Sequence, residues 1–369
     1  MHKIHLVFTL FLSISAKTHS QNIVDKLPYR QPSKTEYNSN FFPSLQKEIN
    51  LAIPSLGSFA VWRHNTLLYE HYFHGCNDTT LFDVKSVTKS VTSALGGIIK
   101  DKGLLPDLNT PVIDVLTEYA PPTKYPPNIW YLEDKLHQDS LRRMMTLKDI
   151  LTMQTGLAWD DFGATVWGFL FAADPVKYTL EVPYDEDPGQ TFNYCSGASA
   201  IFGAVLAKLI KSDLKSFADT NLFTPIGISC KRWDTDPMGR NSGATELFLT
   251  TQDMMKFGLL YLHNGKSNGK QIISESWIKE SLAEHAKLNK WPVLTTPNGY
   301  GYYWWRRKTN GYQAYIASGA GGQLIFIVPK LDMVIVTSCV MNDKNRGRTE
   351  IKLLHGFIDR VIKETKLKN

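Results

Sequence analysis

Two apolar stretches near the start of the chain are rich in β-branched and aromatic residues. Residues 58–62 and 67–73 flank the polar residues 63–66 (RHNT), a pattern that predicts a β-hairpin. Four later stretches of the same character are separated by Gly, Asn, Pro or Asp, at 301–306, 312–317, 323–328 and 333–340. After them, apolar residues recur at the spacing of a helix that covers one face of a sheet: Ile351, Leu354, Phe357, Ile358, Val361 and Ile362.

Between these β-rich ends, residues 110–240 are predicted to be mostly helical. Residues 147–153 and 198–210 are clearly periodic, whereas the acidic and aromatic stretch 158–190 predicts an irregular segment. Because a lone hairpin is marginally stable, we expect it to join the C-terminal strands.

The expected fold is therefore α+β: one antiparallel sheet built from both chain ends, flanked by helices, with a mostly helical inserted subdomain. The sheet subdomain would span about 21–110 and 241–369, and the helical subdomain about 111–240.

The first twenty residues have the shape of a secretory signal. A weakly basic start leads into an apolar run at residues 6–12 and then into small polar residues. Cleavage before Gln21 or after Ser15 would suit it; the alternative is an apolar strand or helix of the mature fold. No later run reaches the roughly 18 apolar residues that a membrane-spanning helix needs. We therefore expect a secreted or periplasmic protein with no stable membrane span.

Composition narrows the class of protein further. The 369 residues are 43% hydrophobic and 21% charged, which excludes a disordered, collagen-like or coiled-coil chain. The net charge of +6 is spread among interspersed acids and bases, so no nucleic-acid partner is expected. Cys76, Cys195, Cys230 and Cys339 form no CxxC pair, and any disulfide pairing stays open. No metal or other cofactor is expected, since His71 and His74 would face opposite sides of a strand.

The strongest chemical signal lies at the start of a predicted helix. Apolar residues recur at helical spacing after Ser86, and Gly103 is a plausible stop. Residues three apart on a helix are neighbours, so the Lys89 amine can reach the Ser86 hydroxyl. A serine becomes a good nucleophile when a base takes its proton, and burial can lower the pKa of a lysine toward that task. The amides at a helix N-terminus also suit a developing oxyanion.

Spacing alone does not identify this pair. The chain holds four other SxxK matches: Ser44/Lys47, Ser212/Lys215, Ser267/Lys270 and Ser276/Lys279. Only Ser86 opens a helix that is apolar and rich in small residues on nearly all sides. Its adjacent glycines at 96 and 97 each cost about 1 kcal/mol relative to alanine, which makes sense if neighbours pack closely there. The alternative to a nucleophile is a capped core helix.

With this motif the chain resembles the serine β-lactamase and penicillin-binding protein superfamily over most of its mature length. Residues 86–90 (SVTKS) resemble its SxxK motif. Residues 147–157 (LKDILTMQTGL) resemble a segment of the class-C-like branch, which includes 6-aminohexanoate-dimer hydrolases and related esterases. Residues 192–196 (FNYCS) resemble the second motif, and residues 317–323 (ASGAGGQ) the third, glycine-rich one.

The resemblance implies a role for each matching residue. Ser86 would be the acylated nucleophile, with Lys89 and Tyr194 sharing proton transfer and either of them serving as base. The oxyanion hole would consist of the backbone amides of Ser86 and Ala320. Ser196, Gly319 and Gly321 would contact substrate. Trp159 would contact it too, with Trp304 and Trp305 as further walls of the pocket; the alternative is that these tryptophans belong to the core.

Two departures from the family pattern affect the expected substrate. Ala317 stands where β-lactamases usually have Lys or His to bind the substrate carboxylate, and Ser196 stands where many members have Asn. Efficient β-lactam hydrolysis is therefore less expected. Five acids would favour an amine-bearing or neutral substrate if they line the site, or else form a solvated loop: Asp160, Asp161, Asp185, Glu186 and Asp187.

The expected function is a secreted serine hydrolase that acts on a small-molecule ester or amide through an acyl-enzyme on Ser86. One alternative is a β-lactamase or D-amino peptidase. Another is a non-catalytic protein that binds cell-wall peptide or serves as a scaffold. The oligomeric state stays open.

Overall fold

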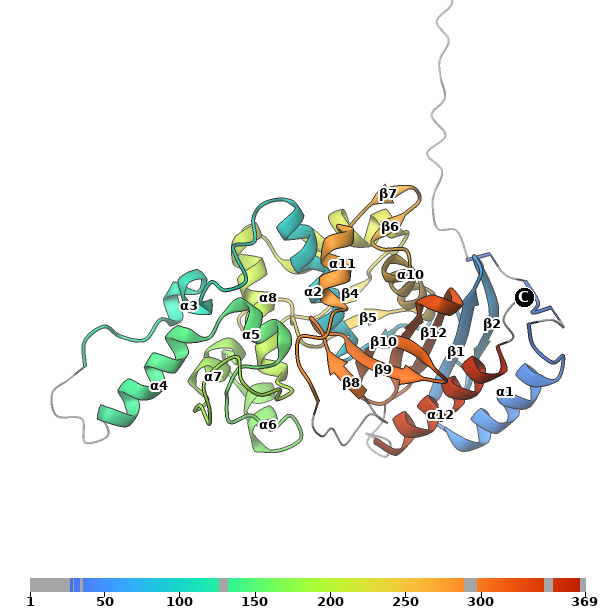
Figure 1. Ribbon diagram of the computed structural model, residues 1–369, viewed down its shortest axis with the longest axis horizontal. Helices are drawn as coiled ribbons and strands as arrows, with labels where there is room; N and C mark the ends of the chain where they lie inside the picture. Colours follow the sequence, from blue (N-terminus) through green and yellow to red (C-terminus); the bar gives the residue numbers. More distant parts are fainter. Residues whose placement is uncertain are drawn as a thin grey trace, which may run out of the picture.

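The two ends of the chain meet in one antiparallel sheet (Figure 1). The computed structural model describes residues 27–28, 30–33, 36–125, 132–288, 297–341 and 348–365. Within these residues the sheet has seven strands in the order β2-β1-β12-β11-β10-β9-β8. Their bounds are β1 (Leu56–Arg63), β2 (Thr66–Tyr72), β8 (Pro297–Tyr300), β9 (Trp305–Thr309), β10 (Tyr312–Gly319), β11 (Gln323–Val328) and β12 (Met333–Cys339). The predicted hairpin pairs through β1 with β12, so the predicted fold class is confirmed.

Helices cover both faces of this sheet. Every residue of β1, β11 and β12 is buried, as expected for strands enclosed on two sides. On one face, Gly258 of α10 (Thr251–Leu262) packs against Val334 and Ile325. On the other face, His355 of α12 (Arg348–Glu364) packs against Phe326. Helix α1 (Phe41–Ala52) lies beside α12, and α2 (Val87–Asp101) contacts β10.

A helical region extends to one side of the sheet (Figure 1). Its elements are α3 (Val112–Val115), η1 (Thr117–Tyr119), α4 (Leu132–Met144), α5 (Leu147–Thr152), α6 (Ala164–Phe171), α7 (Pro175–Glu181), α8 (Ser196–Ile210) and α9 (Leu214–Ala218). Helix α8 packs against α2, α5 and α7, which joins this region to the sheet through α2.

The remaining elements are short. A second, small sheet has the order β3-β5-β4, formed by β3 (Phe82–Asp83), β5 (Leu247–Leu249) and β4 (Arg232–Trp233). The others are η2 (Asp219–Phe223), η3 (Thr224–Ile226), β6 (Lys266–Ser267), β7 (Lys270–Gln271), α11 (Glu275–Ser281) and η4 (Pro329–Leu331). Strand β3 leads directly into the turn before Ser86.

Two local predictions are wrong. The predicted strand 301–306 is a turn as far as residue 304, because Tyr303 has a positive φ of 62° and the Gly301 N–H donates to the Trp304 carbonyl. The predicted irregular stretch 158–190 contains α6 and α7. Helix α6 is apolar on nearly all sides and so has little periodicity, while α7 begins at Pro175 after an Asp174 cap.

The predicted close packing around the glycines of α2 is present. A Cβ added at Gly96 would lie 2.8 Å from the Phe202 ring, and one at Gly97 would lie 2.3 Å from the Trp277 ring. Both rings are buried, so neither can move aside into solvent. The two glycines let α8 and α11 approach α2 closely.

We therefore expect Gly97→Ala to lower the free energy of unfolding by about 2 kcal/mol, since overpacking of a filled core strains both neighbours. Urea unfolding followed by circular dichroism measures this change. Gly356→Ala on α12 is the matched control: nothing lies within 4 Å of its added Cβ, and alanine is the better helix former. A Gly97→Ala protein as stable as the wild type would contradict the packing described.

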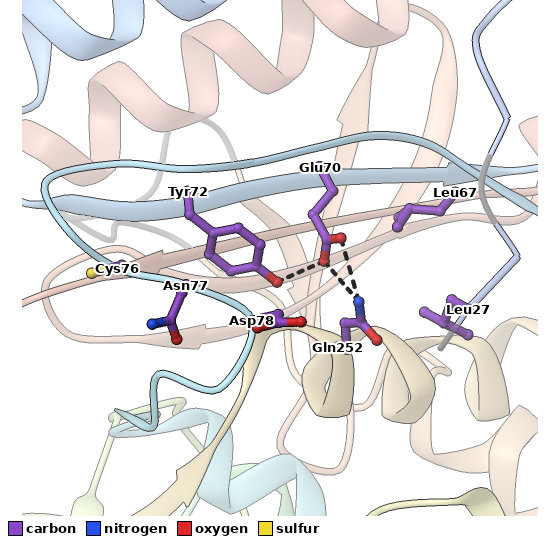
Figure 2. A pocket seen from close by; sticks show the side chains of 8 residues that line it. All are labelled: Leu27, Leu67, Glu70, Tyr72, Cys76, Asn77, Asp78 and Gln252. Carbon is purple, nitrogen blue, oxygen red and sulfur yellow. Dashed lines mark hydrogen bonds between the residues drawn. The ribbon is translucent and has the colours of Figure 1, made fainter. Parts of the chain in front are cut away.

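A polar cluster ties the sheet edge at β2 to α10. The Glu70 carboxylate accepts hydrogen bonds from the Tyr72 hydroxyl at 2.7 Å and from the Gln252 amide at 3.2 Å (Figure 2). The cavity beside it has a volume of about 560 Å³, and Asp78 lines it too. None of the residues predicted for the active site lines this cavity.

Four further predictions concern the secretory signal, membrane-spanning helices, the cysteines and metal binding. The predicted secretory signal at residues 1–20 lies outside the described residues. Within the described part of the chain, no helix is both long enough and apolar enough to cross a membrane. All four cysteines are described, and each is a free thiol. Among the described residues, no three His, Cys, Asp or Glu side chains are grouped to hold a metal ion.

Candidate active site

A sharp turn between β3 and α2 presents Ser86. Lys85 has a positive φ of 51°, and its backbone N–H donates to the Asp83 carboxylate at 3.0 Å. Ser86 then occupies the position just before the first turn of α2, but its side chain makes no capping hydrogen bond. The Ser86 hydroxyl is therefore not used to cap α2, which argues against the alternative of a merely capped core helix.

The Lys89 amine contacts that hydroxyl, as the helical spacing predicts. Lys89 Nζ donates to Ser86 Oγ at 2.8 Å and to the Ala244 carbonyl at 3.1 Å. The residue is 1% exposed. Burial lowers the pKa of Lys89 to about 8, although the negative charge of Asp161 acts to raise it. Near neutral pH, a fraction of the protein molecules therefore has a neutral Lys89 amine next to Ser86.

Tyr194 reaches the same hydroxyl from the segment before α8. Its side chain hydrogen-bonds Ser86, and Lys89 Nζ lies 5.3 Å from the centroid of its ring. The ring is buried and stacks on Trp305, with centroids 5.4 Å apart. Burial and the charge of Asp161 raise the pKa of Tyr194, and the hydrogen bond with Ser86 only partly opposes them. Tyr194 therefore holds its proton while Lys89 can lose one.

Among the predicted acids, Asp161 is the one whose charge acts on Lys89 and Tyr194. Its carboxylate accepts hydrogen bonds from the Ser196 N–H at 2.8 Å, the Ser196 hydroxyl at 3.1 Å and the Trp159 indole N–H at 2.9 Å. Two of the other predicted acids are used elsewhere: Asp160 accepts from the Phe162 N–H, and Glu186 accepts from the Thr191 hydroxyl.

The tryptophans considered for the site have different positions. Trp159 is 5% exposed, packs against Phe169 and holds Asp161 through its indole N–H. Trp305 lies against Tyr194. Trp304 is fully buried beside Tyr261 of α10, so it belongs to the core.

The glycine-rich end of β10 packs on the turn before Ser86. A Cβ added at Gly319 would lie 2.3 Å from the Val84 carbonyl oxygen, so only glycine allows this approach. Ala320 follows in the turn to β11, and Gly321 has a positive φ of 81°. The predicted oxyanion residue Ala320 is thus adjacent in sequence to a residue that touches the Ser86 turn. Ala317 is fully buried and supplies no cation.

The Ala244 carbonyl is the site group that sequence reasoning missed. A backbone acceptor carries no side-chain signal, and 155 residues separate it from Lys89. The role of Asp161 was only partly anticipated, because its carboxylate is fixed by a residue 35 positions away.

A family model and a known relative each match most of this chain. The family model described as Beta-lactamase matches residues 51–354. A 6-aminohexanoate-dimer hydrolase from Paenarthrobacter ureafaciens is 23% identical over 289 residues, which are 76% of this chain and 71% of that protein.

Solved structures share the fold. A Bacillus anthracis protein provisionally named 6-aminohexanoate-dimer hydrolase superposes with a TM-score of 0.70 at 20% identity, covering 92% of this chain and 87% of that one. A Bacteroides dorei protein provisionally named beta-lactamase gives a TM-score of 0.67 at 16% identity, covering 89% of this chain and 99% of that one. At these identities the likeness establishes the fold alone.

Proposed function

The chain belongs to the beta-lactamase family, and from this premise we propose that it is a serine hydrolase with Ser86 as its acylated nucleophile. The observation that carries the proposal is the buried contact of 2.8 Å between Lys89 Nζ and Ser86 Oγ. The lowered pKa of Lys89, about 8, makes a neutral amine available as general base at that contact. The name of the Paenarthrobacter relative supports hydrolysis of an amide.

In the proposed reaction, neutral Lys89 takes the proton of Ser86 as Oγ bonds to the carbonyl carbon of the substrate. The oxyanion accepts hydrogen bonds from the backbone amides of Ser86 and Ala320. As the bond to the leaving alcohol or amine breaks, Tyr194 donates its proton to that group and regains one from Lys89. Water then attacks the acyl-enzyme while Lys89 accepts one of its protons, and Lys89 passes that proton to Ser86 Oγ as the bond to the acyl group breaks.

The substrate proposed is a small ester or amide whose acyl part is neutral or carries an amine. Ala317 offers no positive charge for a substrate carboxylate, and Asp161 places a negative charge close enough to affect both Lys89 and Tyr194. Trp159, Ser196, Gly319 and Gly321 remain the proposed substrate contacts.

A panel of acyl donors tests this proposal. We expect turnover of short acyl esters or linear oligoamides and slow turnover of a chromogenic cephalosporin. Rapid cephalosporin turnover would favour a β-lactamase instead. A folded protein that no acyl donor or serine-directed probe modifies would favour a non-catalytic binder.

The rate of ester hydrolysis is expected to rise as pH increases through about 8, because the neutral amine of Lys89 is the active form. Asp161 stabilises the charged amine, so Asp161→Asn should lower the pKa of Lys89 and move this rise to lower pH. The pH dependence of kcat/KM measures both effects. Asp160→Asn is the matched control, since the carboxylate of this neighbouring acid accepts from the Phe162 N–H within its own loop. If kcat/KM rose at the same pH in Asp161→Asn as in the wild type, the assignment of Lys89 as the general base would be contradicted.

We also propose that residues 1–20 direct the hydrolase out of the cytoplasm and are then removed. Cell fractionation and the intact mass of the protein test this proposal. A protein that stays in the cytoplasm, or one that keeps residues 1–20 after export, would contradict it.

A further inference from the structure

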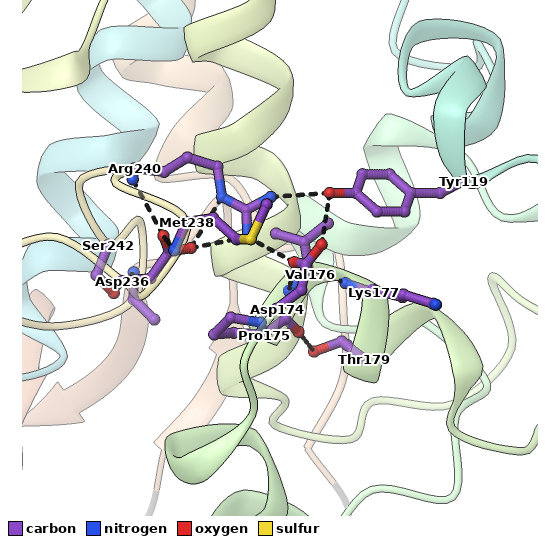
Figure 3. A network of polar contacts seen from close by, with 11 residues as sticks. Tyr119, Asp174, Pro175, Val176, Lys177, Thr179, Asp236, Met238, Arg240 and Ser242 are labelled. Carbon is purple, nitrogen blue, oxygen red and sulfur yellow. Dashed lines mark hydrogen bonds and ion pairs between the residues drawn. The ribbon is translucent and has the colours of Figure 1, made fainter.

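Arg240 is the centre of a polar network at the edge of the helical region (Figure 3). Its guanidinium donates to Asp174 at 2.6 Å, to Asp236 at 2.8 Å and to the Tyr119 hydroxyl at 3.0 Å. The Tyr119 hydroxyl in turn donates to Asp174 at 2.8 Å. Asp174 also accepts from the Val176 N–H at 3.1 Å and so caps α7. One side chain thus joins α7, η1 and the loop that contains Asp236.

The network is partly shielded from water. The side chains of Arg240, Asp174 and Asp236 are 21%, 17% and 14% exposed, so their charges are screened less than those of a surface pair. Burial acts to raise the pKa of Asp174, but the hydrogen bonds from Arg240 and Tyr119 lower it overall. Removal of Arg240 would leave two partly buried carboxylates, Asp174 and Asp236, without their shared cation.

Ala244, whose carbonyl accepts a hydrogen bond from Lys89, follows Arg240 by four residues. The Gly243 carbonyl accepts from the Thr92 hydroxyl of α2 at 3.0 Å, and the Ala244 carbonyl accepts from Lys89 Nζ at 3.1 Å. Gly243 also lies against Gly203 of α8, where an added Cβ would be 3.0 Å from the Gly203 Cα. Residues 241–244 therefore connect Arg240 directly to the helix that bears Ser86 and Lys89.

Packing alone does not enclose this segment. A cleft of about 160 Å³ lies between part of residues 240–243 and apolar residues of α6 and α8, including Leu170 and Ala204. Beside this cleft, Gly243 packs directly on α8, and the Asn241 amide donates to the Trp233 carbonyl at 2.9 Å. The hydrogen bonds of Arg240 add a restraint at the start of the segment, which borders the cleft.

We propose that Arg240 is a positioning residue for the reaction at Ser86: through residues 241–244 it holds the Ala244 carbonyl against Lys89 Nζ and thereby keeps the amine directed at Ser86. This inference rests on the proposed function. Its chemistry is that of a clamp, in which the planar guanidinium reaches three acceptors that a single ammonium cannot bind with the same geometry.

The test compares Arg240→Gln and Arg240→Lys with the wild type in single-turnover acylation by a fluorogenic ester. We expect Arg240→Gln to acylate about tenfold more slowly with KM changed less than about twofold, since a small displacement of a base is costly for the chemical step. The rise of the rate with pH should move by at least about half a pH unit, and Arg240→Lys should restore only part of the rate.

Two controls separate positioning from a general loss of structure. Arg232→Gln removes an exposed arginine of strand β4 that pairs with Asp234, and it should leave the rate and the pH profile unchanged. Asp174→Asn should resemble Arg240→Gln, and the double variant should be no slower than Arg240→Gln alone, because both changes break one network. All rates are measured well below the thermal midpoint of each variant.

Wild-type rate and pH profile in Arg240→Gln would overturn the inference while the proposed function stood. So would a loss that tracks only the fraction of folded protein. Absence of Ser86-dependent acylation in the wild type would overturn the proposed function, and the inference with it.

Discussion

Replacement of Ser86 by alanine is expected to lower the kcat/KM for ester hydrolysis by at least about 10³-fold, because no other group in the site supplies the attacking oxygen. Ser86 Oγ is the atom to which Lys89 donates at 2.8 Å, and Tyr194 hydrogen-bonds the same side chain. Its hydroxyl does not cap α2, so the thermal midpoint should change little. Steady-state hydrolysis of a chromogenic ester measures the loss.

Ser44→Ala is the matched control for this experiment. Ser44 and Lys47 form another SxxK pair, but Ser44 is exposed on α1 and donates to Glu48. It should keep wild-type activity. Full activity in Ser86→Ala would contradict the assigned nucleophile, whereas a loss in both variants would point to an effect unrelated to the motif.

Replacement of Lys89 by methionine should reduce the rate of acylation by about 10²- to 10⁴-fold, the range for loss of a positioned general base. Methionine has a similar length and suits a site that is 1% exposed, but it cannot accept a proton. The residual activity should also lose its rise through pH 8, which comes from the amine. Pre-steady-state acylation across a range of pH measures both effects.

Tyr194→Phe distinguishes the two candidates for the base. The raised pKa of Tyr194 favours a proton donor, so this variant should be slower yet keep the rise through pH 8. If Tyr194→Phe lost the pH dependence and Lys89→Met kept it, the roles would be reversed. Circular dichroism and thermal midpoints confirm that each variant is folded.

Much of the fold could be predicted from local patterns. Runs of β-branched and aromatic residues indicate buried strands such as β1 and β12, and an apolar stripe indicates α12. The turn at 301–304 could not be predicted in this way, because its aromatic residues suit a strand equally well. Helix α6 was missed since an almost entirely apolar helix lacks the polar face that periodicity detects.

The site shows the same division between local and distant information. Ser86 and Lys89 share one helical turn, so their contact follows from spacing. Tyr194 was found only through the order of family motifs. The contribution of Ala244 and the clamp by Arg240 depend on tertiary contacts between segments far apart in sequence, and a carbonyl acceptor has no signature of its own.

The mass of the intact protein after brief incubation with a set of acyl donors tests the central claim most directly. A stoichiometric acyl adduct should form with at least one ester or amide, and proteolytic mapping should place it on the peptide that contains Ser86. The adduct should be absent from Ser86→Ala and present in Ser44→Ala. An adduct on another residue, or one that persists in Ser86→Ala, would contradict the assignment of Ser86 as the nucleophile.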